Sequence, residues 1–400
     1  RAPGTAVPFE SEIRLILTAA MVLFIYTVVI GILNGMDLVE FERKALLAHL
    51  HVGTLGWITM AVFAGALALF GTAEAERQDW LRWTARLSPA AALVYNVAFL
   101  TTTGMLRPIA GAVMLAVIVV MAAWGFAQAR TTVLSVPHLG ILAGLATSVI
   151  GAVLGVLLGV MIADPDAGIT DGVAGAHPAT MVVGFLVPVG MAFAEWLIRP
   201  GSIAERATRA GQAQIALPFL GGVSLMLGEL LGVLPLTMIS LPLEIGGLGI
   251  FLWRMAPAAR RISWLDASPA RHGVVAGLYL VVNIAILAYM IPNYAEDFEA
   301  APRRLVLALD HSIFIGGLTM AILGFIALRS TAVRPQWVDH VVFWGLTAGV
   351  TGFIVGLLSD TDAIIRVATP VLGLAILFAL GVHLTAAVQR MREPAATAAA

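Results

Sequence analysis

Hydrophobic residues occur along the chain in long uncharged runs that are separated by short polar connections. An α-helix needs about 20 apolar residues to cross a hydrocarbon core roughly 30 Å thick. The runs do not alternate apolar and polar residues at every second position, which excludes a transmembrane β-barrel. The pattern predicts twelve spanning helices, at about residues 13–35, 45–70, 87–104, 108–128, 133–163, 176–198, 212–235, 237–253, 272–292, 305–328, 338–358 and 367–389.

The composition agrees with a membrane protein. Of the 400 residues, 60% are hydrophobic and only 12% are charged. A soluble globule of this size cannot bury that much apolar surface. The formal net charge of −1 gives no electrostatic footprint for nucleic acid. We therefore predict an all-α integral membrane protein with a single polytopic domain, residues 1–400, embedded in a lipid bilayer.

The distribution of Lys and Arg predicts the orientation of the chain. Seventeen of the 23 basic residues fall on the side of both termini, which the positive-inside rule makes cytoplasmic, in the inner membrane. We also expect no signal peptide, because no short apolar segment precedes a small-residue cleavage site. Eleven acids gather on the other side with six bases, which are Arg43, Lys44, Arg107, Arg303, Arg304 and Arg366. That acidic outer surface is either a set of solvated loops or a docking face for a basic partner such as a soluble cytochrome c.

Three of the predicted spans resemble one another. The second span has His51, Gly56, Thr59, Met60 and Ala61, and the tenth repeats these residue types 260 positions later, at His311, Gly316, Thr319, Met320 and Ala321. The sixth span places His177 and Gly184 128 positions after His49 and Gly56. This spacing predicts three pseudo-equivalent units of four helices, at residues 1–130, 131–265 and 266–400. A six-plus-six transporter repeat would not generate it.

The eight histidines form two layers in depth. His49, His51, His177 and His311 lie near the outer face, and His138, His272, His340 and His383 lie near the cytoplasmic ends. Ionisable groups inside a membrane are costly and usually functional. His49 and His51 are about 200° apart around their helix, so they cannot chelate one ion but can serve two sites. An interhelical hydrogen bond is the alternative role for any one of them.

Other polar residues limit the chemistry. The chain has no cysteine, which excludes thiolate metal sites, iron–sulfur clusters and covalently attached haem. Glu229 and Glu244 lie deep in apolar sequence, where a carboxylate can take up protons, complete a metal site or simply form an interhelical contact. Glu195 and Arg199 have the spacing of an i, i+4 ion pair.

Residues 49–57, with the sequence HLHVGTLGW, resemble the haem-ligand helix of the C-family heme-copper oxidases, in which one histidine binds each of two haems. The twelve-span topology and the ligands on spans two, six and ten are also similar to the catalytic subunits of oxidases and nitric oxide reductases. They are similar as well to the NnrS-type family of haem- and copper-containing membrane proteins linked to nitric oxide stress.

This resemblance implies that His311 and one imidazole of the pair His49 and His51 hold a non-covalent haem b. The other imidazole would then face a second haem or a metal, copper or non-haem iron, to which His177 contributes. Arg43, Arg303 and Arg304 are candidates for binding haem propionates, or else they are ordinary interfacial residues. His138, His272 and Glu229 are further metal candidates.

The chain also departs from the oxidase pattern. No Tyr follows His177 closely, Gln212 and Gln214 stand where the seventh span should begin with a His pair, and the H-x-H motif is on span two instead of span ten. A complete three-His copper-B site is therefore absent from the sequence.

We expect a haem protein that acts in electron transfer or nitric oxide handling, with a basic cytochrome c or a quinol as electron donor and nitric oxide or oxygen as the gas ligand. The sequence leaves open whether it is a haem-dependent oxidoreductase or a non-catalytic haem sensor or accessory subunit. A proton-coupled secondary transporter of twelve spans is the alternative from another class.

Overall fold

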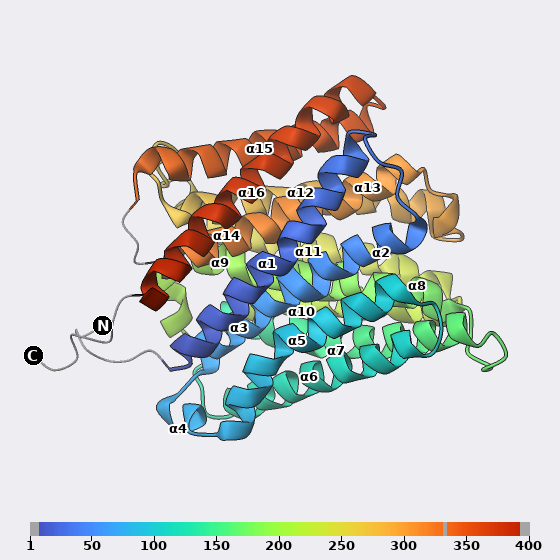
Figure 1. The fold of residues 1–400 in the computed structure, drawn as a ribbon, viewed down its shortest axis with the longest axis horizontal. Helices are drawn as coiled ribbons and strands as arrows, with labels where there is room; N and C mark the ends of the chain where they lie inside the picture. Colours follow the sequence, from blue (N-terminus) through green and yellow to red (C-terminus); the bar gives the residue numbers. More distant parts are fainter. Residues whose placement is uncertain (1–7, 331–333, 393–400) are drawn as a thin grey trace, which may run out of the picture.

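The computed structural model describes residues 8–330 and 334–392, and this part of the chain contains helices and no strand. The helices lie side by side along the long axis of the molecule (Figure 1). Three short helices lie in connections, which are α4 (Ala73–Glu76), η3 (Pro200–Ala204) and η4 (Phe298–Ala300). The long helical runs are α1 (Glu10–Gly35), α2 (Arg43–His51) continued by η1 (Val52–Thr59) and α3 (Met60–Phe70), α5 (Asp79–Thr101), α6 (Leu106–Ala129), α7 (Val136–Ala163), α8 (Gly172–Ala179) continued by η2 (Thr180–Phe185) and α9 (Leu186–Ile198), α10 (Arg209–Leu231), α11 (Leu234–Ala259), α12 (Pro269–Tyr294), α13 (Arg303–His311) continued by η5 (Ser312–Thr319) and α14 (Met320–Arg329), α15 (Gln336–Leu358) and α16 (Asp362–Arg392).

Within the described residues, eleven of these runs are long and apolar enough to cross a membrane. The chain is accordingly an all-α membrane protein that passes the bilayer several times. The remaining long helix, α5, has 23 residues but is not among the eleven. A count of twelve spans therefore stays a prediction.

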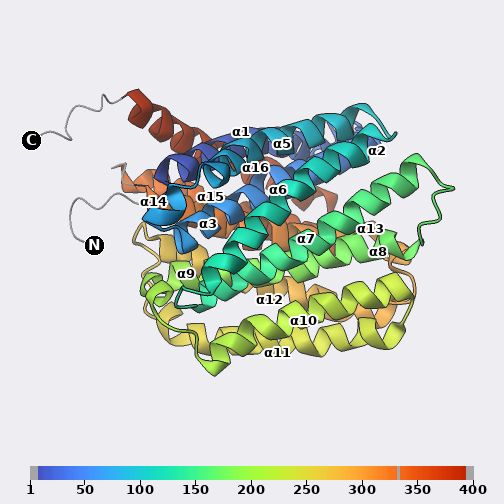
Figure 2. The ribbon, with the colours of Figure 1, turned by 90° about the horizontal axis from the view of Figure 1, so that it is seen from below.

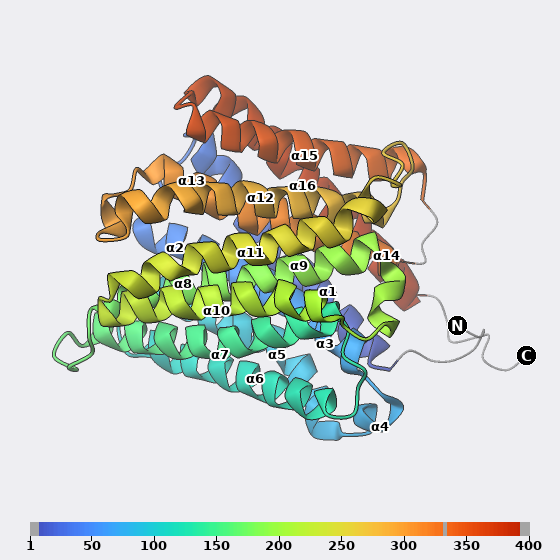
Figure 3. The ribbon, with the colours of Figure 1, turned by 180° about the vertical axis from the view of Figure 1, so that it is seen from behind.

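Three helical runs form the centre of the bundle. The run from α2 to α3 has 83% of its most apolar stretch buried, the run from α8 to α9 has 94%, and the run from α13 to α14 has 78%. The other eight candidate spans have between 33% and 61% buried. Figures 2 and 3 show hairpins such as α10–α11 and α15–α16 on the outside of the bundle. The second, sixth and tenth predicted spans are thus the inner ones.

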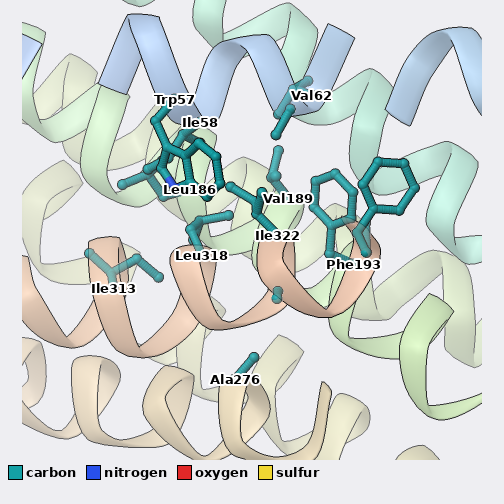
Figure 4. Packing of buried hydrophobic residues seen from close by; sticks show 14 of the residues in the cluster. Trp57, Ile58, Val62, Leu186, Val189, Phe193, Ala276, Ile313, Leu318 and Ile322 are labelled. Atoms are coloured by element: carbon teal, nitrogen blue, oxygen red, sulfur yellow. The ribbon is translucent and has the colours of Figure 1, made fainter. Parts of the chain in front are cut away.

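Side chains from the three inner runs meet in one hydrophobic core. Figure 4 shows Ile58 from η1, Leu186 from α9 and Leu318 from η5 in this core. A hydrogen bond joins two of the runs across it, because Trp57 Nε1 donates to Thr319 Oγ1 at 3.1 Å. The core fixes the depth at which each inner run holds its histidines.

Each inner run contains one π-helical stretch, and these begin at Val52, Thr180 and Ser312. The three starts are almost evenly spaced along the chain, in step with the repeat seen in the sequence. In two of the runs a threonine ends the stretch and donates to the carbonyl oxygen five residues earlier, Thr59 at 3.0 Å and Thr319 at 2.8 Å. Such wide turns are frequent at functional sites. Here they follow the histidine-bearing segment of each run.

Two local predictions were wrong. The helix expected to begin at residue 87 begins at Asp79, because its charged first turns bind a buried carboxylate: Arg82 Nε and Arg86 Nη2 contact Glu12 Oε1 at 3.2 and 2.8 Å.

Glu195 does not pair with Arg199. It forms a two-point ion pair with Arg254 of α11, at 2.7 and 2.8 Å, while Arg199 contacts Glu205 at 2.8 Å. Helix spacing suggested the first pair, but Glu195 faces α11 inside the bundle.

Helix α1 begins and helix α16 ends at the same end of the bundle (Figure 1). This arrangement fits an even number of crossings. Arg1, which contributed to the predicted orientation, and both chain ends lie outside the described residues.

Candidate metal and cofactor sites

A cavity lies between η1 and η5 and is closed on its outer side by α1, α15 and α16. It contains about 1270 Å³ of space not occupied by protein atoms, its open mouth included. His49 and His311 both line it, together with mostly apolar side chains that include Phe24, Trp57 and Phe353. We call this place the first histidine site. An apolar cavity with a few polar groups is typical of a cofactor pocket.

Hydrogen bonds orient both imidazoles of the first site. His49 Nδ1 lies 2.8 Å from the carbonyl oxygen of Thr27 on α1, and His311 Nδ1 lies 2.8 Å from that of Leu307. A carbonyl oxygen only accepts, so each Nδ1 carries the hydrogen and each Nε2 keeps its lone pair. A metal-binding histidine is usually held in this way.

His51 and His177 form a second histidine site on the other side of the same helix. Their Nδ1 atoms lie 2.7 Å from the carbonyl oxygen of Leu47 and 2.9 Å from that of Gly151, so both Nε2 atoms are again available. The two rings are 6.4 Å apart at their centroids and within 10° of parallel. Two imidazole nitrogens each about 2 Å from one metal ion would place the ring centroids roughly 6 Å apart.

The two sites contain equivalent backbone contacts. Thr27 of α1 and Gly151 of α7 each accept from the first histidine of the inner run that follows them in the chain. A Cβ atom on Gly31 would lie 3.3 Å from His49 Cε1, and one on Gly155 would lie 2.9 Å from His177 Cε1. Each of these glycines lies one helical turn after the residue that accepts. Helices α1 and α7 therefore provide the same support to two different histidines.

The aromatic contacts are equivalent too. The Phe99 ring of α5 lies 4.3 Å from that of His51, and the Phe353 ring of α15 lies 4.8 Å from that of His311. The interval between the two phenylalanines along the chain is close to the interval between the two histidines. In the first site, α1 supports His49 and α15 covers His311. In the second site, α7 supports His177 and α5 covers His51.

The third interface between inner runs, between α8–η2 and α13–η5, has no histidine pair. The sequence repeat places Ala179 and Leu309 where the other interfaces have His51 and His49. The Asn283 amide of α12 donates to the Leu309 carbonyl oxygen at 2.9 Å and to Ser312 Oγ at 3.0 Å. Beside the position equivalent to His49, this interface thus has an amide from an outer helix.

The predicted propionate-binding arginines differ in position. Arg303 lines the cavity of the first site. Arg304 instead contacts two acids, Asp360 and Asp362. Arg43 is exposed at the start of α2. Arg303 has the equivalent position at the start of α13. Unlike Arg303, Arg43 is not among the described residues that line the first cavity.

Arg107, on the outer side with them, packs 3.9 Å above the Phe99 ring beside the second site. It also donates to the carbonyl oxygens of Phe99 and Thr102, at 3.0 and 3.1 Å. The buried cation beside the second site is therefore Arg107.

The remaining candidates have contacts of their own, and Glu229 also lies close to the second site: a Cβ atom on Gly175 of α8, two residues before His177, would lie 2.6 Å from Glu229 Oε2. His138 caps α7, with Nδ1 at 2.7 Å from Ser135 Oγ and Nε2 at 3.2 Å from the Leu69 carbonyl oxygen, so both its ring nitrogens have partners within the protein. Glu229 contacts Thr237 Oγ1 at 3.5 Å. His272 lines a different pocket at the other end of the bundle. No group of three or more His, Asp or Glu side chains within the described part of the chain is placed to share a metal ion.

Several acids of the predicted outer surface are paired. Asp37 contacts Arg366 at 3.0 Å, and Glu42 contacts Lys44 at 2.9 Å. The two aspartates bound to Arg304 lie at the same end. Four of the eleven acids are thus paired with three of the six bases already counted on this side, which leaves the acidic excess unchanged.

No family model matches the sequence, and no curated protein matches it. Sequence reasoning had identified the four histidines but missed the carbonyl oxygens of Thr27 and Gly151 and the rings of Phe99 and Phe353. The available signal was that the glycines beside the histidines, Gly31 and Gly155, and the two phenylalanines recur 124 and 254 positions apart, close to the spacing of the histidines. It is visible only when the outer spans are aligned as well as the inner ones.

Proposed function

We propose that this protein is a membrane-embedded b-type haem protein with two bis-imidazole sites. The first site would hold a haem between His49 and His311. The second would hold another haem or a single metal ion between His51 and His177. The observation that carries the proposal is that all four imidazoles direct Nδ1 to a backbone carbonyl oxygen, which leaves four Nε2 atoms as ligands in two pairs.

The first site fits a haem in three respects. Its cavity lies between the two histidine-bearing runs and is lined mainly by apolar side chains. Its two histidines come from different inner runs, so a planar cofactor could be held between them. Arg303 lies on the same cavity and supplies a cation for a propionate. The absence of cysteine leaves only non-covalent attachment.

Electron transfer is the activity that this arrangement favours. A bound haem supplies one-electron chemistry at its iron, and its axial ligands tune the reduction potential. With two imidazoles at each site, no coordination position would remain free for a gas, which would suit electron transfer better than gas binding. Because His49 and His51 project from opposite sides of one helix, the two metal positions would be separated by more than the helix diameter of roughly 10 Å. Nitric oxide handling would require one imidazole to leave its metal.

The two sites lie toward the end of the bundle that we assign to the outside of the inner membrane, with both termini cytoplasmic. Eleven acids and six bases belong to that side in the sequence. This excess favours a basic cytochrome c over a quinol as the electron donor, because opposite charges accelerate encounter.

Absorption spectra of the purified protein test the proposal. Wild type should show a Soret band that sharpens and shifts when dithionite reduces the sample. His311→Ala should change the haem spectrum, His51→Ala should change the spectrum or lower the metal content per chain, and Leu309→Ala, at the equivalent position of the third interface, should do neither. A colourless wild-type protein would refute the proposal and favour a transporter.

A further inference from the structure

A second pocket lies at the opposite end of the bundle from the histidine sites, where α12 and α15 begin and α14 ends. It contains about 760 Å³ of space not occupied by protein atoms, its open side included. Its lining is mostly polar, and it includes Ser268, Arg271, His272, Arg334, Gln336 and Asp339. We call it the cationic pocket, because among the described residues its lining contains two arginines and one acid, Asp339.

Arg271 is the most constrained of these side chains. It is fully buried, and its guanidinium group packs 4.4 Å above the ring of Phe343. Its Nη atoms donate to His340 Nδ1 at 2.9 Å and to the Asp339 carbonyl oxygen at 2.8 Å. Its Nε has no hydrogen-bond partner among the described residues. A buried donor without a partner costs about 1–3 kcal/mol, so a ligand that accepts from it would be bound favourably.

His272 is the second unsatisfied group in the pocket. Only 6% of its surface is exposed, and its Nδ1 has no partner within the part of the chain that the structure describes. A histidine nitrogen accepts a hydrogen bond in one tautomer and donates in the other. Adjacent residues Arg271 and His272 therefore offer one certain donor and one adaptable group to the same pocket.

Positive charge around these groups is only partly compensated. Arg334 Nε donates to Asp339 Oδ1 at 2.7 Å, and its Nη1 lies 3.4 Å from His383 Nδ1. Asp339 lies next to Arg271 as well, so one carboxylate compensates two guanidinium groups and one positive charge remains. The N-termini of α12 and α15, which have 26 and 23 residues, add the positive ends of two helix dipoles.

We propose that the cationic pocket binds an oxyanion of the phosphate class, held by Arg271 and Arg334 with His272 as the adaptable partner. Phosphate oxygens accept from arginine, and a protonated phosphate oxygen can donate to a neutral imidazole. The same chemistry is available from free phosphate and from the headgroup of an anionic lipid. Oxyanion binding at this pocket does not require haem at the histidine sites. A negative result for phosphate binding therefore leaves the proposed haem function untouched, and the reverse also holds.

Two measurements on the full-length purified protein distinguish the sources. Calorimetric titration with inorganic phosphate, at an ionic strength held constant with chloride, tests the free anion. Native mass spectrometry after incorporation into nanodiscs tests lipid, by comparing retained phosphatidylglycerol with retained phosphatidylcholine. Phosphate binding alone would indicate a soluble oxyanion, and preferential retention of phosphatidylglycerol alone would indicate a headgroup.

Variants make the test specific. Arg271→Gln should weaken binding about tenfold or more, since a hydrogen bond to a charged group is typically worth at least that factor. Arg199→Gln is the matched control, because Arg199 lies at the same end of the bundle but pairs with Glu205. Gel filtration reports whether Arg271→Gln folds. If it does not fold, Arg334→Gln is the substitute, since the Arg334 side chain is 16% exposed, and it should also weaken binding. The proposal is wrong if neither phosphate nor phosphatidylglycerol binds preferentially, or if the folded variant binds as tightly as the control.

Discussion

His51 and His311 belong to different inner runs, yet each directs Nδ1 to the carbonyl oxygen four residues before it, at 2.7 and 2.8 Å. They nevertheless serve different sites, because His51 faces His177 and His311 shares a cavity with His49. The same local structure, placed on two inner runs, therefore produces two separate pairs of imidazoles.

The two sites should lose their cofactors independently. His49→Ala and His311→Ala should remove the centre at the first site and leave the second, whereas His51→Ala and His177→Ala should do the reverse. Difference spectra and metal analysis of the four variants measure this. Identical spectra for His49→Ala and His51→Ala would contradict the assignment of these neighbours to separate sites.

The glycines beside the histidines should be sensitive to a single added methyl group. In Gly155→Ala the new Cβ would lie 2.9 Å from His177 Cε1, closer than carbon atoms normally approach. Overpacking typically costs about 1–3 kcal/mol, so occupancy of the second site should fall by about fivefold or more. Gly31→Ala, with 3.3 Å to His49 Cε1, is the matched variant and should perturb its site less. Metal content per chain gives the comparison, and an equal or opposite order would count against the steric explanation.

Arg303 and Arg304 provide a paired test of the propionate contact. Arg303 lines the first cavity, while Arg304 contacts Asp360 and Asp362. Arg303→Gln should speed haem loss to an acceptor protein about tenfold, because it removes a charge-assisted hydrogen bond. Arg304→Gln should leave the rate close to that of wild type. Equal rates for the two variants would show that neither arginine binds a propionate.

The buried ion pair between Glu195 and Arg254 should dominate the stability of its end of the bundle. The exposed fractions of the two side chains are 1% and 12%. Arg254→Met would leave the carboxylate buried without its partner and should destabilise the protein by about 3–5 kcal/mol. The double variant Arg254→Met with Glu195→Gln should recover much of that loss. Unfolding titrations in SDS provide the measurement.

Arg199→Met is the control for that prediction, because its partner Glu205 is 60% exposed. Exposed pairs contribute about 0–1 kcal/mol. If Arg199→Met and Arg254→Met destabilised the protein equally, burial would not determine the strength of these ion pairs.

Much of this architecture could be predicted from the sequence. The uncharged runs predicted a membrane helix bundle, and the angle of about 200° between residues i and i+2 placed His49 and His51 on opposite sides of their helix. The residue types shared by the second and tenth spans identified these spans as equivalent, and both occupy the centre of the bundle.

Other features could not be predicted, and the reasons are physical. A π-helical stretch depends on backbone hydrogen bonds that hydropathy does not report. The partners of His49 and His177 are carbonyl oxygens of Thr27 and Gly151, and every residue has a carbonyl group. The ion pair of Glu195 with Arg254 joins residues 59 positions apart, so helix periodicity gave the wrong partner.

The central claim is that four histidines form two metal centres, at least one of them a haem b. The most direct measurement is a pyridine haemochrome assay combined with metal analysis, expressed per chain of purified protein. The account predicts two metal centres per chain, either two haems b or one haem b with one copper or non-haem iron. A preparation that is folded but contains no haem would contradict it.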